Sequence, residues 1–381
     1  MTRRDETSPV GLPGERDPAD PADPAVSDEE DPGARRRERV RKLTAAVLAV
    51  AVLVLVPVML PNPTITSIGV FTLIFMTGAT AWNGFNGYSG YVSLGHAAFY
   101  GTGAYAFAML AKHVGLQPGY SLFALVPLAG LVAGVVAIPF GVVALRTRRH
   151  QFVIVTIAVF FVFQLLAYNL SWLGGSLGLF VSQPSWPGET FNDRYYYAAL
   201  VVLVLTVALY VKMRNSRFGL QLCAIRDDED RALSVGVHVG RVKLVAFVIS
   251  AIPVGMVGAI YAYFVGQVLP QFAFDPLFDV AIAVMCFTGG MGTLTGPLIG
   301  ALLLEPLQQY ITLQFSASAI YLVVYGALFL LVILFLPRGL IPTTAQAWRA
   351  RRSVTPEEPV ELGAPPLAAL RRRLVSGGGA R

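Results

Sequence analysis

Long runs of apolar residues, broken by short polar connections, form the main pattern along this chain. A run of about 17 residues or more can cross a hydrocarbon core of about 30 Å as a helix. Such runs occupy residues 43–60, 64–82, 93–111, 121–145, 152–170, 195–211, 244–265, 298–315 and 319–336. A further run at residues 277–288 is too short to span and leads into a glycine cluster. The pattern predicts an all-α, polytopic transmembrane helical bundle of about 8–10 spans. We favour ten spans, and eight plus a re-entrant pair is the competing arrangement.

Basic residues between the runs orient the spans, because loops rich in Arg and Lys stay in the cytoplasm. Residues 35–42 carry six Arg or Lys just before the first run, residues 146–149 carry three, and the connection at 212–243 is basic at both ends. The connection at 171–194 has few basic residues and is expected on the outer side. All of these agree with one orientation in the cell membrane, with both termini in the cytoplasm.

Three regions follow from this pattern. Residues 1–42 alternate acids, Pro, Gly and Arg with few large apolar side chains, so a disordered cytoplasmic tail is expected. Residues 43–340 form the transmembrane domain, and residues 341–381 form a cytoplasmic carboxyl-terminal tail. The outer connection at 171–194 is rich in Trp, Gly and Pro. An interfacial cap, part of a partner-binding face and a passive connector all remain open for it.

The composition supports a membrane protein and argues against several other classes. Apolar residues make up 55% of the 381 residues and charged residues only 14%, and the mean hydropathy is +0.61. The net charge of +6 sits in loops and tails, not in a stripe interleaved with aromatics, so nucleic-acid binding is not implied. Cys223 and Cys286 lack metal-ligand spacing, and no metal site or disulfide is expected.

The connection at 212–243 contains the longest charged segment between apolar runs, and we interpret it as a docking surface. Phe218, Leu222 and Ile225 share one helical face, while Asp227 and Asp228 can cap a second short helix that Gly236 ends. Two short helices at the cytoplasmic surface are therefore expected. Acids at the start of the second helix favour its positive dipole end and would offer anions to a partner. The alternative is a pair of merely solvated acids.

Two glycine-rich breaks interrupt what should be membrane-embedded helix. The first break, residues 83–103, reads NGFNGYSGYVSLGHAAFYGTG, and the second break is residues 288–300. Irregular backbone at membrane depth needs shielding by protein or a polar path, and paired breaks of this kind point to a transport path. The alternative is that the glycines only let helices touch. The candidate residues of a translocation path are Asn83, Gly84, Asn86, Gly87, Ser89, Gly90, Ser93, Gly95, His96, Gly290, Gly292 and Gly296.

Few titratable residues lie within the apolar runs. His96 in the first break is interpreted as hydrogen-bonded packing, with a proton relay or ligand as the alternative. Glu305 should face protein or water, because an ionised carboxylate at the bilayer centre is costly. Asp275 and Asp279 lie near the end of a run and are expected to be solvated.

Sequence motifs of common enzymes are absent from the chain. It contains no Walker A Gly-Lys-Ser or Gly-Lys-Thr, no GxSxG, no HExxH and no kinase set. We therefore expect a transport subunit, not an enzyme. If transport is driven by ATP, the ATPase is a separate polypeptide.

Three stretches together resemble the permease subunits of branched-chain amino-acid ABC importers. They are NGFNGYSGYVSLGHAAFYGTGAY at residues 83–105, SRFGLQLCAIRDDEDRALSVGVHVGRVKLVAFVISAIPVGMVGAIYA at 216–262, and VMCFTGGMGTLTGPLIGA at 284–301. They occur in the order typical of that family, and the resemblance covers roughly residues 63–340. It implies a transmembrane permease domain of the type II importer kind over residues 43–340.

The resemblance also implies partners and roles. The expected partners are two nucleotide-binding ATPase subunits, a second related permease subunit and an extracytoplasmic solute-binding protein. ATP and Mg²⁺ would be bound by the ATPase subunits, and no cofactor by this chain. The ATPase-coupling role falls by position on Arg217, Phe218, Gly219, Arg226, Glu229, Ala232 and Gly236. Where the family commonly has Glu-x-Ala-Ala, this chain has Glu229, Asp230, Arg231 and Ala232.

Branched-chain or other hydrophobic amino acids are the first expectation for the solute, because of this resemblance. Relatives with similar permeases carry urea, short amides or aromatic acids, and the path motif does not choose among them. Two other functional classes would need features of their own. An ion-coupled secondary transporter would need a buried titratable site, for which Glu305 and His96 are the candidates. A membrane enzyme would need clustered His, Asp or Glu, and the four histidines are scattered.

Overall fold

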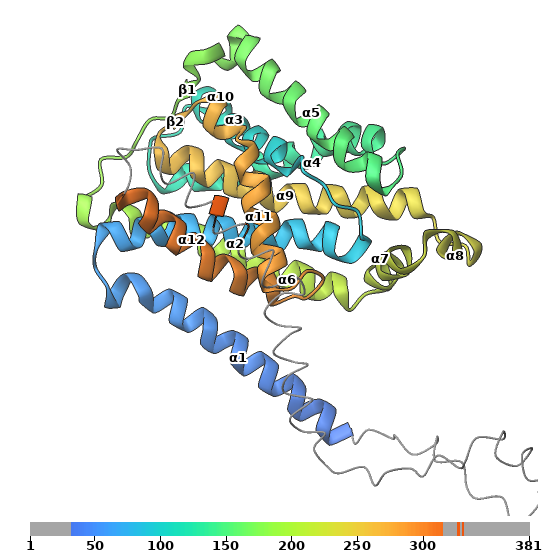
Figure 1. Cartoon of the computed structure of the whole chain (residues 1–381). Helices are drawn as coiled ribbons and strands as arrows, with labels where there is room; N and C mark the ends of the chain where they lie inside the picture. Colours follow the sequence, from blue (N-terminus) through green and yellow to red (C-terminus); the bar gives the residue numbers. More distant parts are fainter. Residues whose placement is uncertain (1–31, 315–325, 328–329, 331–381) are drawn as a thin grey trace, which may run out of the picture. The chain divides into compact units, whose positions relative to one another are not determined.

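A computed structural model describes residues 32–314, 326–327 and 330 of the chain. The described residues are almost entirely helical (Figure 1). Residues up to Leu53 and residues from Val54 onward form separate units. The first helix, α1 (Pro32–Met59), begins inside the tail predicted to be disordered, because its Arg, Glu, Leu and Ala residues favour helix. Most of the apolar run at 319–336 and the whole carboxyl-terminal tail at 341–381 lie outside the described residues.

The elements of the second unit follow the predicted runs, but the two glycine-rich breaks are shorter than expected. Helix persists to Ser89 and resumes at His96, and it persists to Gly289 and resumes at Gly296, so the backbone is irregular only over residues 90–95 and 290–295. The long helices are α2 (Pro63–Ser89), α3 (His96–Val114), α4 (Leu125–Ala144), α5 (Arg149–Asn169), α6 (Phe191–Arg214), α9 (Val239–Val265), α11 (Pro276–Gly289) and α12 (Gly296–Gln314). The short helices are η1 (Tyr120–Ala124), η2 (Ser171–Leu173), η3 (Gly175–Leu177), η4 (Gly188–Thr190), α7 (Arg217–Asp227), α8 (Glu229–Ser234) and α10 (Pro270–Ala273). Strands β1 (Leu179–Phe180) and β2 (Gln267–Val268) pair antiparallel, Leu179 opposite Val268.

Six helical segments of the described residues are long and apolar enough to cross a membrane. They are Pro63–Ser89, Tyr120–Ala144, Arg149–Asn169, Gly188–Arg214, Val239–Val265 and Pro270–Gly289. The last of these differs from expectation, because helix α10 precedes the run at 277–288 and extends the helical segment to 20 residues. The fold class of an all-α transmembrane bundle is confirmed, and the total number of spans stays a prediction.

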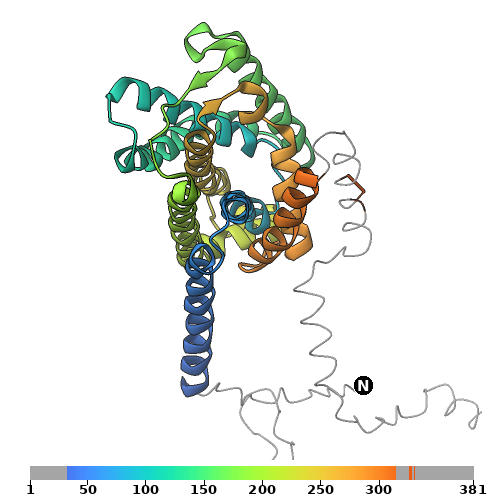
Figure 2. The same ribbon diagram turned by 90° about the vertical axis from the view of Figure 1, so that its left-hand side faces the viewer.

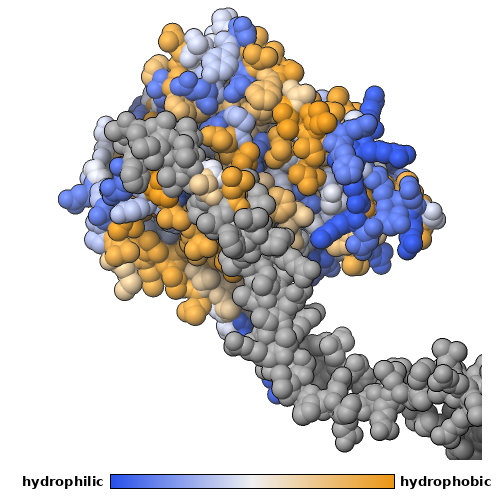
Figure 3. All heavy atoms as spheres, viewed as in Figure 1, coloured by the Kyte–Doolittle hydropathy of each residue, from blue (hydrophilic) through white to orange (hydrophobic). Residues whose placement is uncertain are grey.

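Helix α2 lies at the centre of this unit. It packs against α6, α9, α11 and α12, and almost all of its residues from Thr72 to Ser89 are buried (Figure 2). A second layer is formed by α3 and α4, which both pack along α9. Apolar side chains cover much of the visible helix surface, while polar ones gather at the end that carries α7 and α8 (Figure 3). This distribution is that of a bundle whose sides face an apolar medium.

Helices α3 and α9 approach so closely that glycine is required at the contact. A Cβ atom at Gly103 would lie 2.0 Å from the carbonyl oxygen of Gly255, and one at Gly258 would lie 2.0 Å from that of Tyr100. Small residues at such contacts let helix backbones pack directly, which is how helices associate without a hydrophobic driving force.

We expect Gly258→Ala to displace α3 from α9, because the methyl group would meet backbone that cannot move away. The expected result is loss of most of the monodisperse protein in size-exclusion chromatography in mild detergent. Gly240→Ala on the same helix is the matched control, since nothing lies within 4 Å of a Cβ there. The free energy of unfolding of Gly240→Ala should stay within about 1 kcal/mol of the wild-type value. Equal yields of both variants would contradict the contact.

Candidate functional site

The connection between α6 and α9 folds as the predicted pair of short helices, α7 and α8, which we call the loop helices. Ser216 caps α7 by accepting a hydrogen bond from Gly219 N at 3.3 Å, and Leu222 and Ile225 are fully buried. Asp228 caps α8 by accepting from the backbone N–H groups of Asp230 and Arg231. Gly236 follows α8 with a positive φ of 85°. The predicted helices, the Asp228 cap and the end at Gly236 are confirmed.

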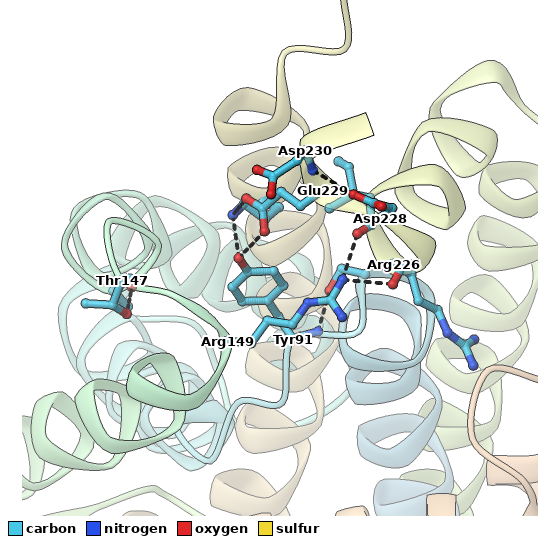
Figure 4. A network of polar contacts seen from close by, with 11 residues as sticks. Tyr91, Thr147, Arg149, Arg226, Asp228, Glu229 and Asp230 are labelled. Atoms are coloured by element: carbon cyan, nitrogen blue, oxygen red, sulfur yellow. Dashed lines mark hydrogen bonds and ion pairs between the residues drawn. The ribbon is translucent and has the colours of Figure 1, made fainter. Parts of the chain in front are cut away.

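Glu229 at the start of α8 turns inward to a buried lysine. Lys243 Nζ, on α9, donates to Glu229 Oε1 at 2.8 Å and to the Tyr91 hydroxyl at 3.0 Å, and that hydroxyl donates to Glu229 Oε2 (Figure 4). The Lys243 side chain is 4% exposed and that of Glu229 is 29% exposed. The three side chains form a closed polar triad that joins α8, α9 and the segment between α2 and α3.

Charge complementarity stabilises this triad. Burial alone would raise the pKa of the Glu229 carboxyl, but hydrogen bonds from Lys243 and Tyr91 and the charges of Lys243 and Arg149 outweigh it, so the pKa lies below its ordinary value. Burial and the neighbouring carboxylate raise the pKa of the Tyr91 hydroxyl. The expectation that acids here are offered to a partner therefore does not hold for Glu229. Asp230 remains exposed.

Arg149 holds the other end of the loop helices. Its Nη2 atom donates to the carbonyl oxygens of Ile225 at 2.9 Å and Arg226 at 2.8 Å, at the carboxyl-terminal end of α7 (Figure 4). A cation here satisfies carbonyl groups that the helix leaves unpaired and complements its dipole. Sequence reasoning assigned Arg149 only to orienting a span. The basic cluster at residues 146–149 gave no sign of which helix end it would contact.

Arg226 connects the loop helices to both glycine-rich breaks. Its Nη1 atom donates to the carbonyl oxygen of Gly87 at 2.8 Å. Gly90 ends α2 in the left-handed region with a φ of 71°, and a Cβ there would come within 3.2 Å of the Arg226 side chain. A Cβ at Gly292 would lie 2.5 Å from Arg226 Nη1. Glycine at these positions leaves room for the guanidinium between the breaks.

Asn83 ties the two breaks together directly. Its Nδ2 donates to the carbonyl oxygen of Thr293 at 2.8 Å, and its Oδ1 accepts from the N–H of Gly292 at 2.8 Å. The side chain is 2% exposed, and its partners lie about 210 residues away along the chain. The side-chain amide of Asn83 thus pairs with one backbone N–H and one backbone carbonyl group of the second break, neither of which lies within a helix.

The other candidate path residues are packed within the described part of the chain. Asn86, Ser89, Ser93 and His96 are fully buried. Asn86, Ser89 and Ser93 accept hydrogen bonds from backbone N–H groups of residues 91–95, and His96 Nε2 lies 3.0 Å from Ser250 Oγ. Cβ atoms at Gly84, Gly87, Gly95 and Gly296 would clash with Tyr210, Asn83, Phe140 and Gly290. Their role in a translocation path stays a prediction.

One of the carboxyl groups differs from expectation. Asp279 was expected to be solvated but is 2% exposed, and its Oδ2 accepts from the N–H of Ala97 at 3.1 Å. It therefore caps α3, whose own cap residue Gly95 offers no side chain. Asp275 is partly buried and caps α11 through Leu277 N. Glu305 faces protein as expected, and its Oε1 accepts from Gln309 Nε2 at 2.8 Å.

The described residues include no cluster of three or more His, Cys, Asp or Glu that could hold a metal ion. What the site offers is mechanical: the loop helices are fixed by Glu229 and Arg149 and reach both breaks through Arg226. Of the residues predicted for coupling, Arg226 and Glu229 make these contacts, Gly219 and Ala232 are buried, and Arg217 is exposed. Phe218 is half-buried.

Comparison with known proteins shows the family of the chain. The family model described as "Branched-chain amino acid transport system / permease component" matches residues 64–333. The chain is 29% identical over 341 residues to the high-affinity branched-chain amino acid transport system permease protein LivM of Escherichia coli K12, covering 82% of this chain and 77% of that protein. It is likewise 29% identical over 306 residues to LivM of Salmonella typhimurium, covering 73% and 70%.

A more distant similarity reaches sugar transport. The ribose import permease protein RbsC of Bacillus subtilis is 28% identical over 140 residues, which cover 36% of this chain and 44% of that protein. No solved structure matches the chain significantly. Because the family model covers well over half of the chain, and the described helices include six that can cross a membrane, this multi-pass membrane protein belongs to the branched-chain amino acid transport system permease family.

Proposed function

We propose that this chain is the translocating permease subunit of an ATP-driven ABC importer. Its loop helices would dock a separate nucleotide-binding ATPase subunit, which binds the ATP and Mg²⁺. The observation that carries the proposal is the chain of contacts from the loop helices to both breaks. Glu229 and Arg149 fix α8 and α7, Arg226 bonds to Gly87, and Asn83 joins the first break to the second.

These contacts suit the transmission of movement. A force applied to the loop helices by an ATPase subunit would act on α9 through the Glu229–Lys243 pair and on the end of α2 through Arg226. A network of charged and amide hydrogen bonds resists displacement more than single contacts do. The loop helices and the two breaks would therefore move together, and access to the path would alternate between the sides of the membrane.

The docking face proposed for the ATPase is the surface of the loop helices that points away from the helical bundle. A shallow hollow there is lined by Ala224, Asp227, Asp228, Arg231, Ala232 and Val235. It combines small side chains with exposed charges of both signs, so it fits a partner with a protruding helix or loop of mixed charge. This face would lie in the cytoplasm, as the basic residues at both ends of the connection indicate.

The remaining parts of the proposal follow from the family. The LivM relatives are named for branched-chain amino acid transport, and RbsC is named for ribose import. We propose hydrophobic amino acids as the solute, delivered by an extracytoplasmic binding protein. A second, related permease would complete the membrane part. Both termini would be cytoplasmic.

The decisive experiment is affinity purification of the tagged full-length chain from its own host in mild detergent. Co-purification of a nucleotide-binding subunit with ATPase activity, and ATP-dependent uptake after reconstitution, are the expected results. A chain that purifies alone and moves solute into vesicles without ATP would overturn the importer proposal. Loss of that uptake in Glu305→Gln would then favour an ion-coupled transporter.

A further inference from the structure

A cavity of about 320 Å³ lies between α2, α3, α9, α11 and α12, away from the loop helices. Packed aromatic rings form much of its lining, and we call them the aromatic wall. Tyr100 stacks on Phe278 with ring centroids 4.4 Å apart, Phe75 packs against Phe278 at 5.2 Å, and Tyr261 packs against Tyr100 at 5.4 Å. Such a volume is at the lower end of the range for small-molecule sites, which suits a solute no larger than an amino acid.

Polar side chains form another part of the lining. Asp275, Gln308, Gln309 and Thr312 make up this part, from the start of α11 and the second half of α12. Asp275 uses Oδ1 to cap α11 at 2.9 Å, which holds the carboxylate at the cavity. Gln309 is held by Glu305 at 2.8 Å. The helix cap and the buried partner thus orient polar side chains that face open space.

Two hydrogen-bond acceptors at or next to this cavity are unpaired. Gln308 Oε1 and, about one turn earlier on α12, Glu305 Oε2 are buried atoms without a hydrogen-bond partner among the described residues. No Lys, Arg or His is among the described residues that line the cavity. Unpaired buried acceptors are costly, so a ligand that brings N–H donors would be stabilised here.

We propose that this cavity is a solute-binding station for a small molecule that carries an ammonium group on an apolar body, as a hydrophobic amino acid does. Asp275 and Gln308 would accept from the ammonium group, and the aromatic wall would cover the apolar body and attract the cation through its ring faces. A lipid chain could use the wall but leaves the acceptors unpaired. This inference rests on the proposed import of such solutes and adds where the solute binds.

The test is equilibrium binding of tritiated leucine to the full chain, purified with its accompanying subunits in lipid nanodiscs and without the solute-binding protein. Competition with 3-methylbutylamine and 4-methylpentanoate separates the two head groups. Asp275→Asn can keep the helix cap while it removes the charge. It should weaken leucine and 3-methylbutylamine binding about tenfold or more and leave 4-methylpentanoate binding unchanged or stronger.

A second variant tests the volume of the cavity. Thr312→Trp should fill the space and abolish binding of all three compounds. Leu313→Trp is the matched control for Thr312→Trp, since Leu313 lies on the same helix and is 53% exposed. Asp193→Asn, at the start of α6, is the matched control for Asp275→Asn, because it removes a carboxylate charge elsewhere. Both controls should bind as wild type does.

Three outcomes are distinguishable. Wild-type affinity in both Asp275→Asn and Thr312→Trp would overturn the binding station. Failure of the wild-type complex to bind any of the three compounds would overturn the proposed ligand class. If the same preparation contains an ATPase subunit and carries out ATP-dependent uptake, the importer proposal stands in either case. If it contains none and uptake needs no ATP, the importer proposal fails separately.

Discussion

Replacing Glu229 with alanine is expected to loosen the loop helices and to give the largest local effect of any single change there. The substitution leaves the Lys243 ammonium, which is 4% exposed, with the Tyr91 hydroxyl as its remaining hydrogen-bond partner. Breaking a fully buried ion pair costs about 3–5 kcal/mol, and about 2 kcal/mol is expected here because the Glu229 carboxylate is partly exposed. Amide hydrogen exchange in α8 should accelerate roughly thirtyfold.

The neighbouring acid provides a matched control. Asp230 is exposed and its side chain makes no contact with Lys243, so Asp230→Ala should leave exchange in α8 within about twofold of wild type. The double variant Glu229→Leu with Lys243→Met removes both charges and should recover part of the lost protection. Equal exchange rates in Glu229→Ala and Asp230→Ala would show that the triad does not hold α8.

Replacing Asn83 with alanine should destabilise the whole membrane unit. It leaves the N–H of Gly292 and the carbonyl oxygen of Thr293 without their partner, and each unsatisfied buried group costs about 1–3 kcal/mol. The free energy of unfolding should fall by about 4 kcal/mol, which corresponds to a drop in melting temperature of roughly 10 °C. A thermal melt in detergent, followed by tryptophan fluorescence, measures this drop.

Asn169 offers the comparison for Asn83. It is an exposed asparagine whose Nδ2 donates to Leu165 within the same helix, so Asn169→Ala should change the melting temperature by roughly 1 °C or less. Asn83→Asp keeps an acceptor for Gly292 but loses the donor to Thr293, and its melting temperature should lie between those of wild type and Asn83→Ala. An unchanged melt in Asn83→Ala would contradict the tie between the breaks.

The sequence was informative wherever a feature depends on neighbouring residues. Long apolar runs predicted α6 and α9, and the Asp228 cap and Gly236 predicted the extent of α8, because capping and apolar length are local properties. The helical extension by α10 was missed, since the run at 277–288 looked too short by itself.

Contacts between segments that are distant in the sequence could not be predicted from neighbouring residues. The partners of Lys243, Arg149 and Asn83 depend on how helices pack, and one sequence does not specify which helix ends meet. Asp279 was wrongly expected to be solvated because a carboxylate near the end of an apolar run usually reaches water. Burial is tolerated here because the first backbone N–H groups of α3 need an acceptor.

The cap that Asp279 provides for α3 also bears on how the protein is made. Ala97 and Asp279 are 182 residues apart, and a ribosome adds roughly 5–20 residues per second. Helix α3 therefore emerges roughly 10–35 s before the carboxylate that completes its first turn. Until α11 has been synthesised, the amide groups at the start of α3 need water or another acceptor. The first half of the chain accordingly enters the membrane without this hydrogen bond at the start of α3. It reaches its final structure only after the later helices have been synthesised.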